Sequence, residues 1–210
     1  MSGAPERAGS LFALSPLRAH ELRAAAALLG RAFCENAMNR AVVGGTPQRR
    51  ERTNEAGMRA VLPSARVAGA VMAARAGEGL AGVLVALPPE VISLPRASWP
   101  ALLRLVVTQG PTVAGRWSSV AEALQLHRPL APHAYLATLG VEPALQRSGV
   151  GRALVAGWLA AIDAARQRAY LETDSTLNMA WYERFGFAVR AELTLLGVSV
   201  YLMERSPRDA

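Results

Sequence analysis

The spacing of apolar and polar positions divides the chain into short helices and strands. Apolar residues return with a helical period in the segments expected to be helical: 21–33, 48–62 ending near Pro63, 99–126 with an interruption at Gly110–Pro111, 150–168 and 178–185. Extended apolar runs mark the expected strands: 11–14, 65–74, 80–87, 134–141, 169–173, 188–190 and 193–203. This order predicts a mixed α/β fold around one sheet, in which 193–203 is buried because both of its faces are apolar.

The composition is that of one globular domain with a short appendage. The chain has 210 residues, of which 51% are hydrophobic and 19% charged, so one core can be filled. We expect residues 1–10 to form a flexible tail and residues 11–206 to form the domain. No run of 18 uncharged apolar residues occurs, and the first ten residues lack the apolar core of a secretory signal. A cytoplasmic protein without membrane contact is therefore expected.

All 23 basic residues are arginine, and the absence of lysine excludes two chemistries. A Walker P-loop and a Schiff-base enzyme both require a lysine. The single cysteine, Cys34, excludes an intrachain disulfide, and His20, His127 and His133 are too scattered to predict a metal cluster. The net charge of +7 favours anionic partners, but the arginines are scattered and form no run of five, so nucleic-acid binding is not expected.

A glycine-containing loop joins the expected strand 134–141 to the expected helix that begins at residue 150. It reads Gln146-Arg147-Ser148-Gly149-Val150-Gly151. The first turn of a helix has unpaired N–H groups and a partial positive charge, and glycines allow a ligand to approach the backbone. Arg147 and Arg152 add positive charge beside it. We therefore expect this loop to bind a diphosphate.

Two common nucleotide loops do not fit these residues. A nucleotide P-loop needs Gly-Lys-Ser/Thr, and a dinucleotide fold needs a small residue three positions after Gly151, where the bulky Leu154 stands. Coenzyme A is the third class of ligand that uses such a loop.

Two segments resemble the sequence motifs of one enzyme superfamily. The pattern Gln-x-x-Gly-x-Gly, preceded by Leu139-Gly140-Val141-Glu142-Pro143, resembles motif A of the GNAT superfamily of N-acetyltransferases. The later segment, from Leu171-Glu172-Thr173 through Asn178 and Tyr182 to Gly186-Phe187, resembles its motif B. The residues 134–141 and 170–173 are similar to the puromycin-acetyltransferase-like bacterial branch.

The resemblance implies a fold and an activity. The fold would be a single GNAT-like domain, with a mostly antiparallel mixed sheet flanked by helices, a two-helix insertion at 99–126 and a cofactor-binding core at 134–187. The activity would be metal-free transfer of the acetyl group of acetyl-CoA to a primary amine of a small molecule, by direct attack in a ternary complex. The alternatives are a non-catalytic acyl-CoA-binding regulatory domain and an enzyme that acts on a protein amine. Relatives imply a monomer or a homodimer.

The resemblance also assigns roles to individual residues. The residues implied to bind the cofactor are Leu139, Gly140, Val141, Gln146, Arg147, Ser148, Gly149, Val150, Gly151, Arg152 and Asn178. Tyr182 would protonate the departing thiolate, and Glu172, His133 or a water chain would take the proton of the amine. Simpler roles are open for the same residues: core packing for Tyr182, helix capping for Asn178 and a solvated strand end for Glu172.

Overall fold

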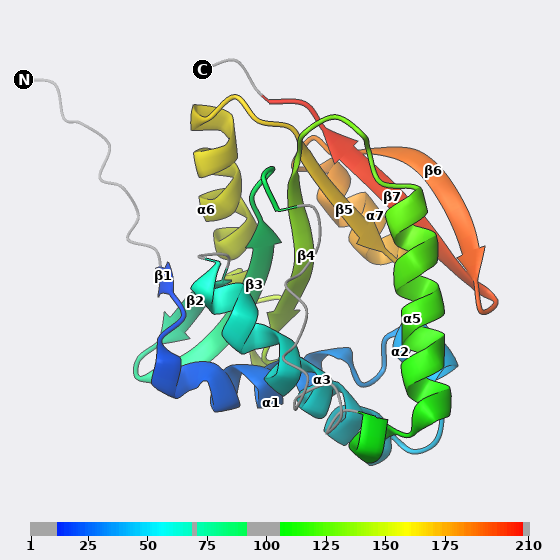
Figure 1. Cartoon of the computed structure of the whole chain (residues 1–210). Coiled ribbons are helices and arrows are strands. Elements are labelled where there is room, and N and C mark those ends of the chain that lie inside the picture. Colours follow the sequence, from blue (N-terminus) through cyan, green and yellow to red (C-terminus); the bar gives the residue numbers. More distant parts are fainter. Residues whose placement is uncertain (1–11, 69–70, 92–105, 208–210) are drawn as a thin grey trace, which may run out of the picture.

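The computed structural model describes residues 12–68, 71–91 and 106–207 (Figure 1). The elements in chain order are β1 (Ala13–Pro16), η1 (Ala19–Glu21), α1 (Leu22–Phe33), α2 (Ala37–Val43), α3 (Pro47–Val67), β2 (Val71–Ala76), β3 (Gly79–Leu87), α5 (Pro111–Leu126), β4 (Ala134–Val141), η2 (Pro143–Leu145), α6 (Val150–Ala164), β5 (Ala169–Thr173), α7 (Thr176–Glu183), β6 (Ala188–Leu195) and β7 (Val198–Arg205). The expected tail at residues 1–10 and the first part of the expected insertion, 99–105, lie outside the described residues; residues 106–109 are helical.

The strands form one sheet in the order β1-β2-β3-β4-β5-β7-β6. All neighbouring strands are antiparallel except β4 and β5, which are parallel. The crossover between these two strands is α6, as expected for a parallel pair. The structure thus confirms the predicted single α/β domain with a mostly antiparallel mixed sheet.

Helices cover both faces of this sheet (Figure 1). One apolar cluster joins α6 and α7 to the face that carries Leu136 and Leu171. Two further clusters lie on the other face, where α1 and α3 cover β2 and β3, and α2 and α5 cover the side chains of Tyr135 and Tyr170. Because side chains alternate along a strand, residues 135 and 170 point away from α6. Among the described residues, we find no helix of the length and hydropathy required to cross a bilayer.

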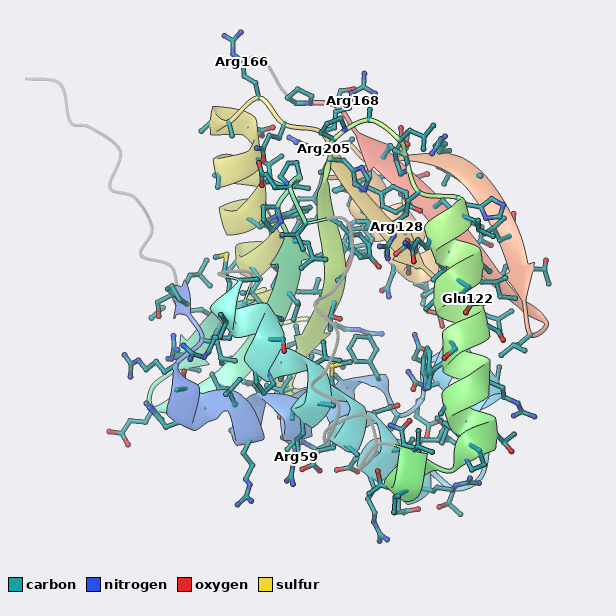
Figure 2. All side chains as sticks on the ribbon, viewed as in Figure 1. Arg59, Glu122, Arg128, Arg166, Arg168 and Arg205 are labelled. Carbon is teal, nitrogen blue, oxygen red and sulfur yellow. The ribbon has the colours of Figure 1, made fainter. Side chains whose placement is uncertain are left out.

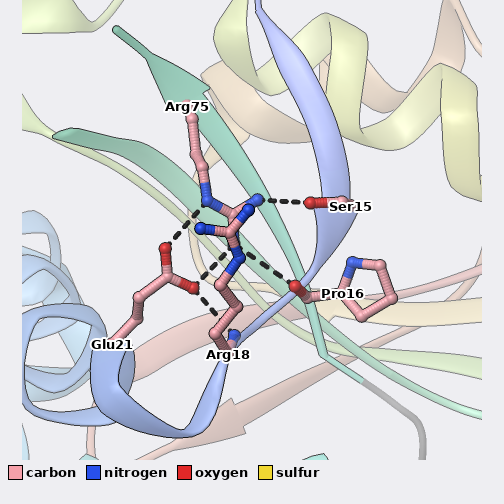
Figure 3. A network of polar contacts seen from close by, with 5 residues as sticks. All are labelled: Ser15, Pro16, Arg18, Glu21 and Arg75. Atoms are coloured by element: carbon pink, nitrogen blue, oxygen red, sulfur yellow. Dashed lines mark hydrogen bonds and ion pairs between the residues drawn. The ribbon is translucent and has the colours of Figure 1, made fainter. Parts of the chain in front are cut away.

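A buried ion pair fixes η1 to β2 (Figure 3). The Arg75 guanidinium donates to both carboxylate oxygens of Glu21, at 2.8 and 2.6 Å, and also to Ser15 Oγ and the Pro16 carbonyl. The Arg18 N–H donates to the same carboxylate at 2.7 Å. These contacts, foremost the hydrogen bond from Arg75, lower the pKa of Glu21 to about 2.

We expect the variant Glu21→Gln to be less stable than the wild type by about 1–3 kcal/mol at pH 7, because it leaves the Arg75 charge buried without its partner. The pKa of Glu21 is lower in the folded than in the unfolded chain. Its contribution is therefore complete above pH 4.5 and disappears as the pH falls towards 2. Urea unfolding at pH 7 and pH 3 measures this difference, and Glu78→Gln, in the exposed β2–β3 turn, is the control. An equal difference at both pH values would contradict the assignment.

The helix α3 continues past the proline at which the sequence predicted its end. Pro63 lies inside α3 and is exposed, whereas Leu62 and Ala65 on either side of it are buried in the cluster beneath α1. Burial of these apolar residues outweighs the lost hydrogen bond of the proline. The predicted strand 65–74 is therefore wrong over its first residues. The short helix α2, capped by the side chain of Asn36, was not predicted.

The last two strands form a hairpin where the sequence predicted one long buried strand. Leu196 and Gly197 both have positive φ values, 51° and 77°, and make the turn between β6 and β7. β6 is an edge strand with alternating exposure, while Val200, Leu202 and Met203 of β7 are buried. The prediction for 193–203 failed because the leucine before the glycine concealed the turn.

Candidate functional site

The parallel strands β4 and β5 separate soon after they begin. They pair at three positions, from Ala134 with Ala169 to Leu136 with Leu171. Beyond Leu136, β4 is paired with β3 and β5 with β7, and the register of the β3–β4 pair shifts opposite Ala137. Figure 1 shows the C-terminal ends of the two strands diverging. The edges that face each other beyond this point lack a strand partner among the described elements.

The loop that follows β4 exposes backbone donors at the start of α6. Gly149 has a φ of 96° and Arg147 a φ of 65°, and these two left-handed residues turn the chain into the helix. Within the described part of the chain, the N–H groups of Arg147, Gly149, Val150, Gly151 and Arg152 have no acceptor. The first internal bond of α6 is from Ala153 to Gly149. This loop can therefore receive an anion.

The side chains around the loop leave these donors accessible. Gln146, Arg147, Ser148 and Arg152 are exposed, whereas Val150 is buried. The Ser148 hydroxyl donates to the Leu145 carbonyl at 2.6 Å and so stabilises the loop itself.

The entrance to α6 lies between β4 and α7. A Cβ added at Gly151 would lie 3.6 Å from Val141 of β4 and 3.8 Å from the Trp181 ring of α7. The predicted diphosphate loop is therefore located at the wide end of the separation between β4 and β5. Leu139 and Val141, both predicted to bind the cofactor, pack their side chains against the apolar cluster that joins α6 to the sheet.

Gly140, which is predicted to lie beside the cofactor, is also required for the packing of α1 on β4. A Cβ at this position would lie 2.4 Å from Leu29 Cδ2 of α1. The absence of a side chain lets α1 pack directly on β4. The backbone of Gly140 still belongs to the part of β4 beyond the last pair with β5.

The helix α7 carries the two predicted residues of the second motif. Tyr182 is buried, with its ring in edge-to-face contact with Trp181 and Phe187, and no hydrogen bond to its hydroxyl occurs within the described residues. Burial raises its pKa well above the usual value of 10. Asn178 is exposed, and the cap of α7 is Ser175, whose hydroxyl accepts from the Asn178 N–H at 3.3 Å.

Glu172 is buried on the sheet face opposite α6, in contrast to the solvated strand end that the sequence left open. Its side chain is 7% exposed, and Arg128 Nε lies 3.4 Å from its Oε1. Burial raises the pKa of Glu172, although the neighbouring Tyr135 hydroxyl and the Arg128 guanidinium act in the opposite direction. Glu172 follows the last residue of β5 that pairs with β4, so it stands at the point where the strands separate.

Three further residues complete this polar cluster, and the sequence did not single them out. Arg128 lies with its guanidinium carbon 3.9 Å from the centre of the Tyr135 ring, between the end of α5 and the sheet (Figure 2). Tyr135 and Tyr170 are direct partners in the β4–β5 register. The Tyr170 hydroxyl is buried and has no hydrogen-bond partner among the described residues. The available sequence signal for this cluster was the pair of tyrosines, one near the start of each of two expected strands.

The other candidate residues lie farther from the loop or have structural contacts. The His133 ring meets the edge of Tyr170 at 5.3 Å between centroids, and its Nδ1 lies 2.9 Å from the Ala131 carbonyl. Cys34, half-buried after α1, has a pKa raised by burial, which does not favour a thiolate nucleophile. Asp174, which the sequence did not assign, accepts from Asn36 Nδ2 and the Met38 N–H at 2.7 Å each and so fixes α2 beside β5.

Comparison with known proteins agrees with this geometry. Residues 106–189 match the family model described as the acetyltransferase (GNAT) domain. This segment of the chain is therefore similar to the GNAT superfamily of acetyltransferases. The matched segment contains β4, α6, β5 and α7, which are the elements that build the site. This match supports the expected acyl-CoA N-acetyltransferase activity.

Solved structures show the same fold over nearly the whole chain. A protein described as histone acetyltransferase HPA2 and related acetyltransferase, from Corynebacterium glutamicum, has a TM-score of 0.71 at 22% identity, covering 95% of this chain and 98% of that one. Arylalkylamine N-acetyltransferase 2 from Aedes aegypti has a TM-score of 0.64 at 12% identity, covering 94% and 99%. The paia N-acetyltransferase from Thermoplasma acidophilum, in complex with coenzyme A, has a TM-score of 0.59 at 12% identity, covering 93% and 98%. At these identities the likeness concerns the fold.

Proposed function

We propose that the protein transfers the acetyl group of acetyl-CoA to a primary amine of a small molecule, by direct attack in a ternary complex. The observation that carries this proposal is the coincidence of two features at one end of the sheet. The unpaired backbone donors at the start of α6 lie at the wide end of the gap between β4 and β5. A long ligand with a diphosphate near one end and a reactive group at the other fits that arrangement.

The residues of the α6 entrance have the chemistry that a diphosphate needs. Five N–H groups there have no acceptor among the described residues, and Arg147 and Arg152 are exposed beside them. The β4 backbone beyond Leu136 would hold the pantetheine arm as an added strand. An N–H group of Leu139–Val141 would polarise the carbonyl of the thioester. Asn178, exposed on α7, is available for a further contact with the coenzyme.

Tyr182 is proposed as the general acid. Its raised pKa keeps the phenol protonated throughout the neutral range, so a proton is available for the departing sulfur. Glu172 is proposed as the base that takes a proton from the ammonium form of the acceptor, so that the neutral amine can attack the thioester carbonyl. A carboxylate whose pKa is raised by burial accepts a proton more readily at neutral pH than an exposed one.

The variant Glu172→Gln is expected to lower kcat/KM by roughly 10–100-fold at pH 7, since the amide cannot accept the proton and water replaces it poorly. Steady-state kinetics with acetyl-CoA and the best amine measure this loss. His133→Gln is the matched variant of the rival base, and we expect it to retain activity within about twofold. A large loss of kcat/KM in His133→Gln, with Glu172→Gln still active, would assign the role of the base to His133.

The restricted access to Glu172 favours a small acceptor over a protein. Side chains of α2 and α5 pack in the same cluster as Tyr135 and Tyr170, and the carboxylate is 7% exposed. A panel of small primary amines and N-terminal peptides, with thiol release as the readout, tests this proposal. Turnover with small amines is the expected result. Turnover with peptides alone would contradict the substrate class, and acetyl-CoA binding without any turnover would indicate a regulatory domain instead. The similarity to the puromycin-acetyltransferase-like branch remains a prediction that the same panel tests.

A further inference from the structure

The arginine–carboxylate pairs among the described residues differ in geometry, and the pair at the site has the longest contact. In three pairs, one guanidinium donates to both oxygens of one carboxylate at distances between 2.6 and 3.0 Å: Arg75 with Glu21, Arg31 with Glu142, and Arg205 with Asp163. These pairs join separate elements of the fold. Arg128 approaches Glu172 with Nε at 3.4 Å from Oε1, which exceeds the roughly 2.7–2.9 Å of a charge-assisted hydrogen bond.

The looser pair has a distinct effect on its carboxylate. Glu21 and Glu172 have similarly buried side chains, 11% and 7% exposed. The close contacts of Arg75 lower the pKa of Glu21, whereas the pKa of Glu172 is raised because burial outweighs the opposing effects of Tyr135 and Arg128. The Glu172 carboxylate is thus easier to protonate than that of Glu21, and a proton acceptor requires this property.

Arg128 is itself held in place by the ring beneath it. Its guanidinium lies over the face of Tyr135, 3.9 Å from the ring centre, and its side chain is 16% exposed. Tyr135 belongs to β4 and Glu172 to β5, so one side chain bridges the two strands just before they separate. Arg128 itself comes from the segment after α5.

We propose that Arg128 is a positioning residue for acetyl transfer, which orients the Glu172 carboxylate across the β4–β5 seam and favours its charged form. This inference rests on the proposed function, because it assigns Arg128 a role through Glu172. The guanidinium supplies positive charge at a distance that leaves the carboxylate able to exchange a proton. Stacking on Tyr135 fixes where that charge lies.

The groups that face Glu172 determine the sign of the expected pH effect. Arg128 is the cation in contact with it, while Tyr135 of β4 and Tyr170 of β5 are phenols that also favour the charged carboxylate. The His133 ring is in edge contact with the Tyr170 ring. The positive charge of Arg190, on β6, opposes the rise in the pKa of Tyr170, and Arg190 forms an ion pair with Glu204 at 3.1 Å. α2 and α5 contribute apolar side chains to the cluster around the two tyrosines, among them those of Met38, Val42, Val113 and Val120. Removal of Arg128 therefore removes the positive charge that, together with the Tyr135 hydroxyl, favours the carboxylate, and the pKa of Glu172 rises.

The test compares Arg128→Gln with Arg128→Lys and with Arg190→Gln as the matched control. Carbon-13 NMR of protein labelled at the glutamate carboxyl carbon, with Glu172→Gln to assign the signal, reports the titration of Glu172 without any turnover. We expect Arg128→Gln to raise that titration midpoint by at least about one pH unit and to move the acid limb of kcat/KM by the same amount. Arg190→Gln should change neither, and the Kd for acetyl-CoA should stay within about twofold in all variants.

Arg128→Lys separates charge from geometry. It keeps the charge but loses the planar stacking group, so the Glu172 titration should stay within a few tenths of a pH unit while kcat/KM falls by about tenfold. An unchanged Glu172 titration in Arg128→Gln, or a shifted titration with an unmoved acid limb, would overturn the role of Arg128. If Arg128→Gln does not fold, a large titration shift in Arg128→Lys would overturn it as well. Failure of the proposed function is distinguished by the wild type, which would then bind acetyl-CoA and acetylate no amine.

Discussion

Gly151→Asp is expected to weaken acetyl-CoA binding by at least about a thousandfold. The aspartate would place a negative charge in the first turn of α6, where the diphosphate is proposed to bind. Loss of two charge-assisted hydrogen bonds at roughly 2 kcal/mol each corresponds to about this factor. Isothermal titration calorimetry with acetyl-CoA measures it directly.

The local packing provides a matched control for this variant. A Cβ at position 151 makes ordinary contacts with Val141 and Trp181, at 3.6 and 3.8 Å, and α6 has regular geometry there. We therefore expect Gly151→Ala to fold normally and to keep acetyl-CoA affinity within about tenfold. Comparable binding by Gly151→Asp and Gly151→Ala would show that the diphosphate binds elsewhere.

Tyr182→Phe is expected to lower kcat by roughly 10²–10³. Phenylalanine keeps the ring that packs against Trp181 and Phe187 but removes the hydroxyl that is proposed to protonate the sulfur. Because the hydroxyl makes no hydrogen bond within the described residues, the fold should be nearly unaffected. Kinetics at saturating acetyl-CoA and amine measure kcat, and calorimetry should give a Kd for acetyl-CoA within about twofold of the wild type.

The comparison of Tyr182→Phe with Tyr201→Phe distinguishes catalysis from packing. Tyr201 is a half-buried tyrosine of β7 that packs against the same α6 cluster. We expect its phenylalanine variant to keep a kcat within about twofold. A Tyr182→Phe enzyme with full kcat would assign Tyr182 to the core alone, which is the simpler role that the sequence also allows.

The segment from β4 to α7 could be predicted from sequence because its signals are local. The strands 134–141 and 169–173 have the predicted bounds, and Gly186 has the expected left-handed conformation, with a φ of 88°. The helix α6 ends at Ala164, four residues before the predicted end, where Arg166 adopts a positive φ of 50°. Apolar periodicity and glycine positions are sufficient for such elements.

Elements that depend on tertiary contacts were not predictable in this way. The path of α3 through Pro63 depends on its packing against α1. The position of α2 depends on Asp174, which binds its N-cap and its first turn from a position 136 or more residues later in the chain. The hairpin at Leu196–Gly197 is concealed by apolar residues on both sides. In each case the deciding contact is absent from the local sequence pattern.

The candidate site also contains residues that local motifs predict and contacts that only the fold creates. The sequence identified the α6 entrance, Glu172, Asn178 and Tyr182 as candidates, because the motifs contain them. It did not predict that Glu172 would be buried beside Arg128, since Arg128 reaches the carboxylate from the segment after α5, 44 residues earlier. Nor did it predict that the Trp181 ring would flank Gly151.

The central claim is that backbone donors at the start of α6 bind the diphosphate of acetyl-CoA. Calorimetric titration of the wild type and of Gly151→Asp with acetyl-CoA and with S-acetylpantetheine, which lacks the diphosphate, tests it most directly. We predict tight binding of acetyl-CoA to the wild type alone, and weak binding of S-acetylpantetheine that is the same for both proteins. Equal affinities of the wild type for the two ligands, or undiminished binding of acetyl-CoA by Gly151→Asp, would contradict the claim.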